Sequence, residues 1–278
     1  MDVIQVAILI GIGALLGFAS GVTGISAVHL VVAILFLLPM FALAILPSLG
    51  TSLLVDVIGA GAVVCLYFRH KNVDFKVGLM MGLIAFSFAI MGASIAIAIG
   101  LSSEYLLVGG LGIFQILIGL TFIVRGYRKK ESEESHLMEK SRLAIWLENK
   151  PDSYKKLILI VASIMLGLIG GLFGAGGGFA ITFLLVFLLG FESHKAVGTA
   201  CLVMLFTAAG AFLIYTAGAF IIHGVLYVNL EYGLIIGAAC ILGAFFGTQF
   251  AHHLSEKHLT IALGVIILVF GVFMILPK

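Results

Sequence analysis

The sequence predicts an all-α membrane protein made of two inverted repeats, each of about five transmembrane or half-membrane helices and broken at a glycine-rich segment. Composition indicates the membrane, because 62% of the 278 residues are hydrophobic and only 10% are charged, against about 25% charged residues in soluble domains. The duplication is visible in the glycines. At a constant offset of 153, Gly17, Gly21 and Gly24 recur as Gly170, Gly174 and Gly177.

Other residues repeat at similar offsets. Gly50-Thr51 and Tyr67 recur 148 positions later as Gly198-Thr199 and Tyr215. Two related halves, each with a glycine-interrupted apolar segment, are typical of secondary transporters whose binding site lies between the repeats.

Five apolar segments are expected in each half. In the first half they lie near 3–20, 24–38, 50–68, 76–100 and 105–124, and in the second near 157–172, 177–190, 198–216, 230–251 and 257–276. Residues 3–38 would form a single helix of about 54 Å, too long for a bilayer core of about 30 Å. The helix must therefore break, and the glycine cluster is the natural place. The two pieces could be short full spans or the half-helices of a re-entrant hairpin.

The basic residues predict the domains and their orientation. Residues 1–124 and 157–278 form the two repeats, and 125–156 form a polar linker that holds nine of the 15 Lys and Arg residues. Cytoplasmic loops are enriched in these residues, so the linker is expected in the cytoplasm. The segment 69–76 has three basic residues, whereas its counterpart 217–229 has none. The two repeats are therefore expected to be inverted in a multi-pass cell-membrane protein, with both termini outside.

The two glycine-rich breaks are the first candidate substrate site. The residues expected to bind substrate are Ser20, Gly21, Thr23 and Gly24 in the first break, and Gly174, Gly176, Gly177 and Gly178 in the second. Non-helical backbone inside a membrane is tolerated where it is buried in protein or lines a polar cavity, and a helix that starts there presents free N–H groups to an anion. The alternative is a tight helix-packing seam, since Gly13, Gly17 and Gly21 also have small-xxx-small spacing.

Hydroxyl side chains open the third segment of each half. Thr51 and Ser52 in the first half, and Thr199 in the second, could contact the substrate. Alternatively, each could cap its own helix, which is the commoner role of a hydroxyl at a helix start.

Asp56 is the acidic residue placed clearly inside a predicted span. An acid there is costly and is a functional candidate by default, so Asp56 is a candidate proton-coupling residue, with His29 as a second one just after the first break. The alternative is a structural aspartate held by neighbouring hydroxyls.

Other functions are disfavoured. The chain has no HExxH, GxSxG or P-loop pattern and no carboxylate pair placed for hydrolysis, so an enzyme is not expected, and neither is a catalytic residue, a metal or a cofactor. The expected partners are a small anion, the lipid bilayer and a coupled proton, with no nucleic acid. The 22 phenylalanines are what contact with lipid requires, so they indicate no particular oligomeric state.

The second break resembles a known family. The Gly170–Gly178 stretch, followed by Phe179-Ala180 and by Ala196-Val197-Gly198-Thr199, is similar to the sulfite exporter TauE/SafE-like family, also called the four-toluene sulfonate uptake permease group. The resemblance covers essentially the whole chain, although Val22-Thr23-Gly24-Ile25 replaces the glycine run in the first half.

The resemblance implies transport of a small sulfur-containing anion, such as sulfite, a sulfonate or a sulfocarboxylate, with proton coupling as an extension. The leading hypothesis is a transporter that works by alternating access. The alternative is a passive anion channel or a permease for another small organic anion.

Overall fold

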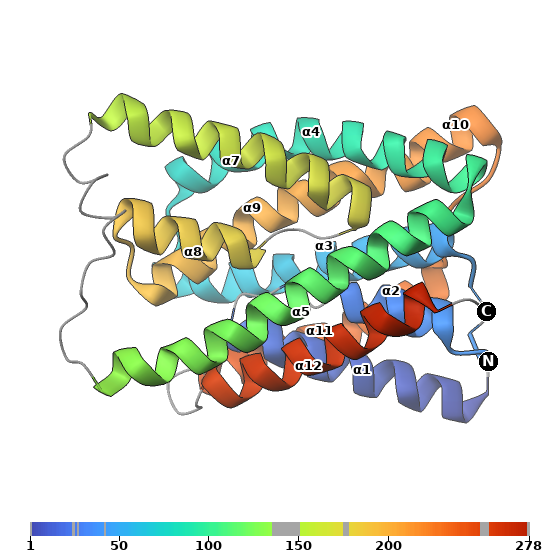
Figure 1. Ribbon diagram of the computed structural model, residues 1–278, viewed down its shortest axis with the longest axis horizontal. Coiled ribbons are helices and arrows are strands. Elements are labelled where there is room, and N and C mark those ends of the chain that lie inside the picture. Colours follow the sequence, from blue (N-terminus) through green and yellow to red (C-terminus); the bar gives the residue numbers. More distant parts are fainter. Residues whose placement is uncertain are drawn as a thin grey trace.

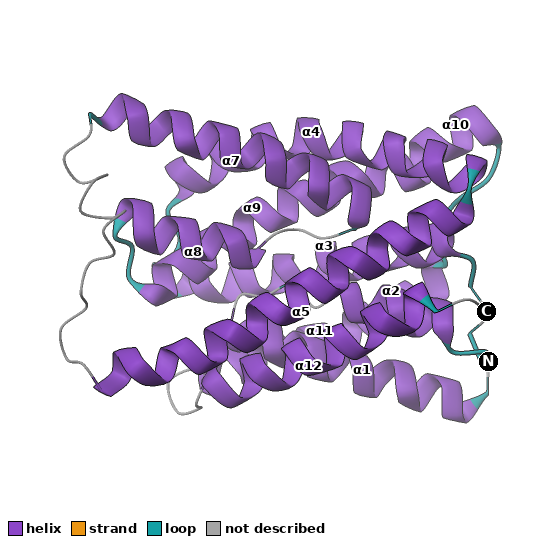
Figure 2. Ribbon diagram, viewed as in Figure 1, coloured by secondary structure: helices purple, strands orange, loops and turns teal. Residues whose placement is uncertain are grey.

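The computed structural model describes residues 2–23, 26, 28–41, 43–134, 151–174, 178–250 and 256–276. Within these residues the regular structure is helical and contains no strand, as Figure 2 shows. The all-α prediction is confirmed.

The first half contains five helices and the second half a matching series. The helices of the first half are α1 (Val3–Thr23), α2 (Val28–Leu37), α3 (Ile45–Arg69), α4 (Phe75–Ser102) and α5 (Glu104–Glu134). Those of the second are α7 (Asp152–Phe173), α8 (Gly178–Leu189), α9 (Ser193–Leu213), the π-helical turn η1 (Ile214–Gly218), α10 (Ala219–His223), α11 (Leu230–Phe250) and α12 (Glu256–Ile275).

Most of these helices are long and apolar enough to cross a bilayer. Among the described residues, seven helical stretches meet both conditions: α1, α3, α4, α5, α7, the continuous run from α9 to α10, and α11. By contrast, α2 has 10 residues and α8 has 12, so at 1.5 Å per residue they are about 15 and 18 Å long, roughly half of a bilayer core. The protein is a multi-pass helical membrane protein.

Two helices extend into the predicted linker. The apolar run of the first half ends near residue 124, but α5 continues to Glu134, and α7 begins at Asp152 rather than at 157. Residues 125–134 are rich in Arg, Lys and Glu, which favour helix in water as well as in a membrane. The end of the apolar run near residue 124 therefore marks the end of the candidate span, and α5 continues beyond it.

The helices run along the long axis of the molecule. In Figure 1, α1 begins and α12 ends at the right, whereas α5 ends and α7 begins at the opposite end. As a result, α1 and α7 run in opposite directions (Figure 1). The main pairs are α1 with α11, α5 with α12, α4 with α7 and α9, and α3 with α9 and α11.

Glycines allow two of these pairs to approach closely. A Cβ atom at Gly17 would collide with the carbonyl oxygen of Cys240 in α11, and one at Gly21 would lie 2.8 Å from the carbonyl oxygen of Ala244. In the other pair, a Cβ at Gly171 of α7 would collide with the carbonyl oxygen of Ala89 in α4. Small residues at helix contacts are a common way to pack membrane helices, so the packing interpretation of this glycine spacing applies to Gly17 and Gly21.

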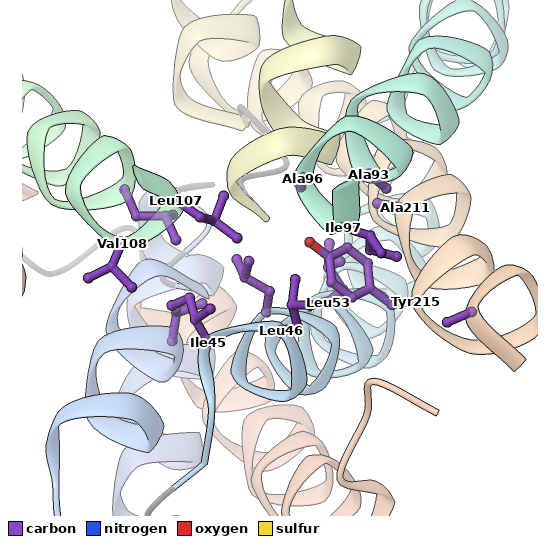
Figure 3. Close-up of a cluster of buried hydrophobic side chains, with 14 of the residues drawn as sticks. Ile45, Leu46, Leu53, Ala93, Ala96, Ile97, Leu107, Val108, Ala211 and Tyr215 are labelled. Carbon is purple, nitrogen blue, oxygen red and sulfur yellow. The ribbon is translucent and has the colours of Figure 1, made fainter. Parts of the chain in front are cut away.

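The apolar interior and exterior both fit a membrane protein. A buried cluster where α3, α4, α5 and α9 meet contains Ile45, Leu53, Ile97 and Tyr215 (Figure 3). Outside, many large apolar side chains are exposed, including Leu117 at 57%. A soluble protein rarely exposes so much apolar surface, whereas lipid accommodates it.

Candidate functional site

α3 carries the polar centre of the molecule. Ser52 is fully buried and Asp56 is 5% exposed, and their spacing of four residues places them one turn apart on one face of the helix. The Ser52 hydroxyl donates a hydrogen bond to the Leu49 carbonyl at 2.7 Å. Intrahelical bonding of this kind is how a buried hydroxyl is satisfied within an apolar span.

The connection between α1 and α2 contacts this face at Asp56. The Ser26 hydroxyl lies 3.0 and 3.1 Å from the two carboxylate oxygens of Asp56 and donates to them. Ser20 and Asp56 also line a small cavity of about 10 Å³, close to the smallest volume that holds one water molecule. Ser20, Ser26 and Asp56 therefore form one buried polar group.

Ser26 lies in the first predicted break but outside the predicted binding residues. Ser26 lies six residues after Ser20 and 30 residues before Asp56 in the sequence. Its contact with Asp56 could not be deduced from this spacing. The sequence signal for Ser26 is its hydroxyl, which it shares with Ser20 and Thr23 of the same break.

The end of α7 contacts the same face of α3 from the second half. α7 ends at Phe173, and Gly174 follows with a φ of +68°, a conformation that favours glycine. A Cβ atom at Gly174 would lie 3.0 Å from Leu49 Cδ2 and 3.5 Å from Ser52 Oγ. The two halves thus contact α3 one helical turn apart, at Ser52 and at Asp56.

His29 lies against α5. It is 4% exposed, its ring meets the edge of Phe114 at 5.7 Å, and its carbonyl accepts a hydrogen bond from Gln115 Nε2 at 3.1 Å. Its Nδ1 has no hydrogen-bond partner among the described residues. Phe114 in turn stacks on Phe173 at 4.6 Å, so His29 is connected to the end of α7 through two aromatic rings.

Thr51 and Thr199 occupy equivalent positions. Thr51 Oγ1 donates to the Pro47 carbonyl at 2.6 Å and accepts from the Asn229 amide at 2.8 Å. Thr199 Oγ1 donates to the Lys195 carbonyl at 2.7 Å and accepts from the Asp74 amide at 2.9 Å. Each hydroxyl therefore ties its helix to the residue that precedes a helix of the other half.

The structure does not bring these two threonines together. Gly198, beside Thr199, lies against Tyr67, and Tyr67 is 16 residues beyond Thr51 on α3, a distance of about 24 Å along the helix. Their contact with substrate stays a prediction, and any such contact would involve two separate places.

Several predicted site residues are described only in part. Gly24, Gly176 and Gly177 lie outside the described residues, and the side chain of Thr23, the last residue of α1, is not described. Gly178 is the first residue of α8.

Two equivalent tyrosines differ in their hydrogen bonds. Tyr67 of α3 donates from its hydroxyl to the carbonyl of Gly21 at 3.1 Å. Tyr215, its counterpart in the repeat, is fully buried, and its hydroxyl has no partner among the described residues. Figure 3 shows the Tyr215 ring inside the buried cluster, beside Ile97.

These features define a helical membrane protein with a buried polar centre, which is the general form of a membrane transporter. The family model described as "Sulfite exporter TauE/SafE" matches residues 9–274, and the chain belongs to this family. The family resemblance inferred from the sequence is confirmed.

The similar curated proteins have transporter names. The chain is 28% identical over 282 residues to "Probable membrane transporter protein MJ0441" of Methanocaldococcus jannaschii, covering 97% of this chain and 95% of that one. It is 23% identical over 228 residues to "Probable membrane transporter protein YunE" of Bacillus subtilis, covering 81% and 78%. No solved structure matches the chain.

Proposed function

We propose that the protein is a secondary transporter that moves a small sulfur-containing anion, such as sulfite, a sulfonate or a sulfocarboxylate, by alternating access. The observation that carries the proposal is the meeting of both halves on one face of α3, where Gly174 approaches Ser52 and Ser26 bonds to Asp56. The sulfur-containing substrate is suggested by the description of the matching family.

The proposal includes two inverted repeats, 1–124 and 157–278. It is supported by the opposite directions of α1 and α7 (Figure 1) and by the equivalent pairings of α1 with α11 and α7 with α4. The matching bonds of Thr51 to Asn229 and Thr199 to Asp74 also support it. A transporter of this kind holds its substrate where the repeats meet.

The anion would be held by backbone and hydroxyl groups. The proposed binding residues are those of the two breaks, together with Ser52, and none of them is a Lys or Arg. Free N–H groups at a helix start and the positive end of its dipole favour a negative ligand. Such a site suits a small, singly charged anion better than a multiply charged one, which loses more hydration on entry.

Asp56 would couple anion binding to a proton. A carboxylate about one helical turn from a bound anion would repel it by about 3 kcal/mol at an effective dielectric constant of about 20. Protonation of Asp56 removes this repulsion, so the anion and the proton would bind together. His29, whose ring packs against Phe114, is a second proposed proton carrier.

The orientation proposed is linker inside and both termini outside. Among the described residues, Arg69, Lys71, Lys76 and Lys195 lie near the end of the molecule where α5 ends and α7 begins. The described loops and helix ends at the other end carry Asp2, Glu104 and Glu231 and no Lys or Arg. This distribution agrees with the positive-inside rule.

The test is transport by purified protein in liposomes. Vesicles would be offered sulfite, thiosulfate, sulfate and short sulfonates with and without an imposed pH gradient, and the accumulated anion would be measured. Accumulation above the external concentration is expected for at least one sulfur anion. Failure to accumulate any of them under either proton or sodium gradients would contradict the proposal, and purely downhill movement would indicate a channel.

A further inference from the structure

A cavity of about 360 Å³ opens where α3 ends, beside the start of α9 and the end of α11. This is the end of the molecule where the chain leaves α5 and enters α7 (Figure 1). Its volume lies in the range of small-molecule binding pockets. It shares no lining residue with the small cavity beside Asp56.

The polar lining of this cavity is basic. Its polar side chains include Arg69, His70, Asn72, His194, Thr248 and Gln249, and none of the described residues that line it is acidic. A concave surface with one sign of charge attracts ions of the other sign. A guanidinium presents its N–H groups in a planar fork that matches an oxyanion.

The charge of Arg69 is not cancelled by a described neighbour. The acid closest in sequence, Asp74, forms an ion pair with Lys195 at 3.0 Å. In the described part of the chain, Arg69 itself has no ion pair. Arg69 is exposed, so it stands at the entrance, where an anion from solution would meet it first.

The floor of the cavity connects to the first break. Tyr67 lines the cavity, is only 5% exposed, and stacks its ring near His194 at 6.4 Å. Its hydroxyl bonds the carbonyl of Gly21, in the last turn of α1. One hydrogen bond therefore links the floor of the cavity to the last turn of α1, just before the interruption that follows this helix.

Among the described residues, Arg69 and His70 have no basic counterparts at the equivalent positions of the second half. At the repeat offset of 148, Tyr67 corresponds to Tyr215, but Arg69 and His70 correspond to Ala217 and Gly218. Duplication of the fold alone would not produce a basic cavity at one end, so its charge is a specific property of the first half.

We propose that this cavity is an anion-binding vestibule, in which Arg69 and His194 first bind a small sulfur oxyanion or sulfonate on the linker side of the membrane. The inference rests on the proposed function for its ligand, because it places the same class of anion at a second, outer site. It predicts that the two faces of the membrane differ in apparent affinity.

The experiment compares Arg69→Gln with Lys76→Gln. Lys76 is exposed at the same end but does not line the cavity, so its variant removes a positive charge without touching the vestibule. Binding of sodium sulfite and sodium ethanesulfonate to purified protein would be measured by calorimetry. Arg69→Gln should weaken binding about tenfold, the effect of losing a charged hydrogen bond, and Lys76→Gln should leave it unchanged.

Transport in oriented vesicles gives the second measurement. For Arg69→Gln, the half-saturating concentration should rise about tenfold for anion offered on the linker side and stay constant on the other side. Arg69→Lys keeps the charge but loses the planar fork, so its half-saturating concentration on the linker side should lie between those of the wild type and Arg69→Gln. His194→Gln should also raise the half-saturating concentration for anion offered on the linker side.

The outcomes separate the vestibule from the proposed function. Unchanged binding in Arg69→Gln, equal effects of Arg69→Gln and Lys76→Gln, or no binding of either anion to the wild type would overturn the vestibule. Wild-type binding that depends on Arg69, in a protein that moves no sulfur anion, would support the vestibule and contradict the transport proposal. Thermal unfolding of each variant would exclude misfolding as the cause.

Discussion

Asp56 and its hydroxyl partner are the most specific residues of the proposed mechanism. The sequence predicted a functional or a structural aspartate, and the bond from Ser26 is compatible with both. A carboxylate that exchanges a proton needs a donor that stabilises its charged form and a small space for water, and Asp56 has both. Both features favour a proton-exchanging role for Asp56, which transport measurements test.

Replacement of Asp56 by Asn is expected to uncouple transport from the proton gradient. The amide has nearly the same shape but cannot bind and release a proton, so pH-driven accumulation should fall toward the level of protein-free vesicles while anion binding remains measurable. Asp152→Asn is the matched control, because the Asp152 side chain is 92% exposed at the start of α7. Unchanged pH-driven flux in Asp56→Asn would leave Asp56 with a structural role only.

The two equivalent tyrosines provide a matched pair for stability. Tyr67→Phe removes the donor that satisfies the buried Gly21 carbonyl, and the free energy of unfolding should fall by about 1–2 kcal/mol. Tyr215→Phe removes a buried hydroxyl that has no partner among the described residues, so it should be neutral or slightly stabilising. Thermal unfolding of both variants in detergent would show the difference, and equal losses would contradict it.

At the scale of elements, the glycine seam between α1 and α11 explains why these helices lie so close. Gly17 meets the backbone of α11, whereas Gly11, earlier on the same helix, has no atom within 4 Å of a Cβ added there. The close approach of α1 and α11 therefore requires a glycine at position 17 but not at position 11.

Alanine substitution should separate these two glycines. Gly17→Ala forces α1 away from Cys240 and should destabilise the protein by about 1–3 kcal/mol. Gly11→Ala adds a methyl group to open space and should stabilise it by about 0.5–1 kcal/mol. Melting temperatures of the two variants should move in opposite directions, and a shift of the same sign would mean that the seam does not limit the approach.

Segment positions were largely predictable from the sequence, because hydrophobicity and glycine spacing act locally. The pieces expected near 3–20 and 24–38 match α1 and α2, and that near 177–190 matches α8. The π-helical turn at Ile214–Gly218 was not predicted, because its bonding pattern leaves no mark on hydrophobicity.

The site was predictable only in its parts. The sequence selected Asp56, Ser20 and Ser52, but the partners of the selected residues depend on how helices pack at long range. Spacing does not reveal that Ser26 bonds to Asp56. Nor does it reveal that Thr51 bonds to Asn229 at a separation of 178 residues.

At the scale of the whole molecule, the two halves are joined by equivalent connections at opposite ends. At one of them, Asp74 caps α4, receives a hydrogen bond from Val77, and pairs with Lys195 of α9. Partial burial raises the pKa of Asp74, but the bonds from Lys195 and from the backbone lower it more, so its pKa lies below its ordinary value.

This lowered pKa predicts an acid-dependent contribution to stability. The charged Asp74 stabilises the folded protein at neutral pH, and this contribution is lost as the pH falls below the ordinary value of 3.8 toward the lower folded pKa. Asp74→Asn keeps the cap but removes the charge, so it should cost about 0.5 kcal/mol at pH 7. The difference from wild type should shrink on acidification. Unfolding followed between pH 7 and pH 3 would test this, and a constant difference would contradict it.

The central claim is that the two halves alternately expose one anion site to the two sides of the membrane. Counterflow tests it most directly: vesicles loaded with unlabelled substrate anion, such as sulfite, receive a trace of labelled anion outside, and the internal label is followed over time. Alternating access predicts a transient accumulation of label above its external concentration. Label that only rises to the external concentration, with no overshoot, would contradict the claim.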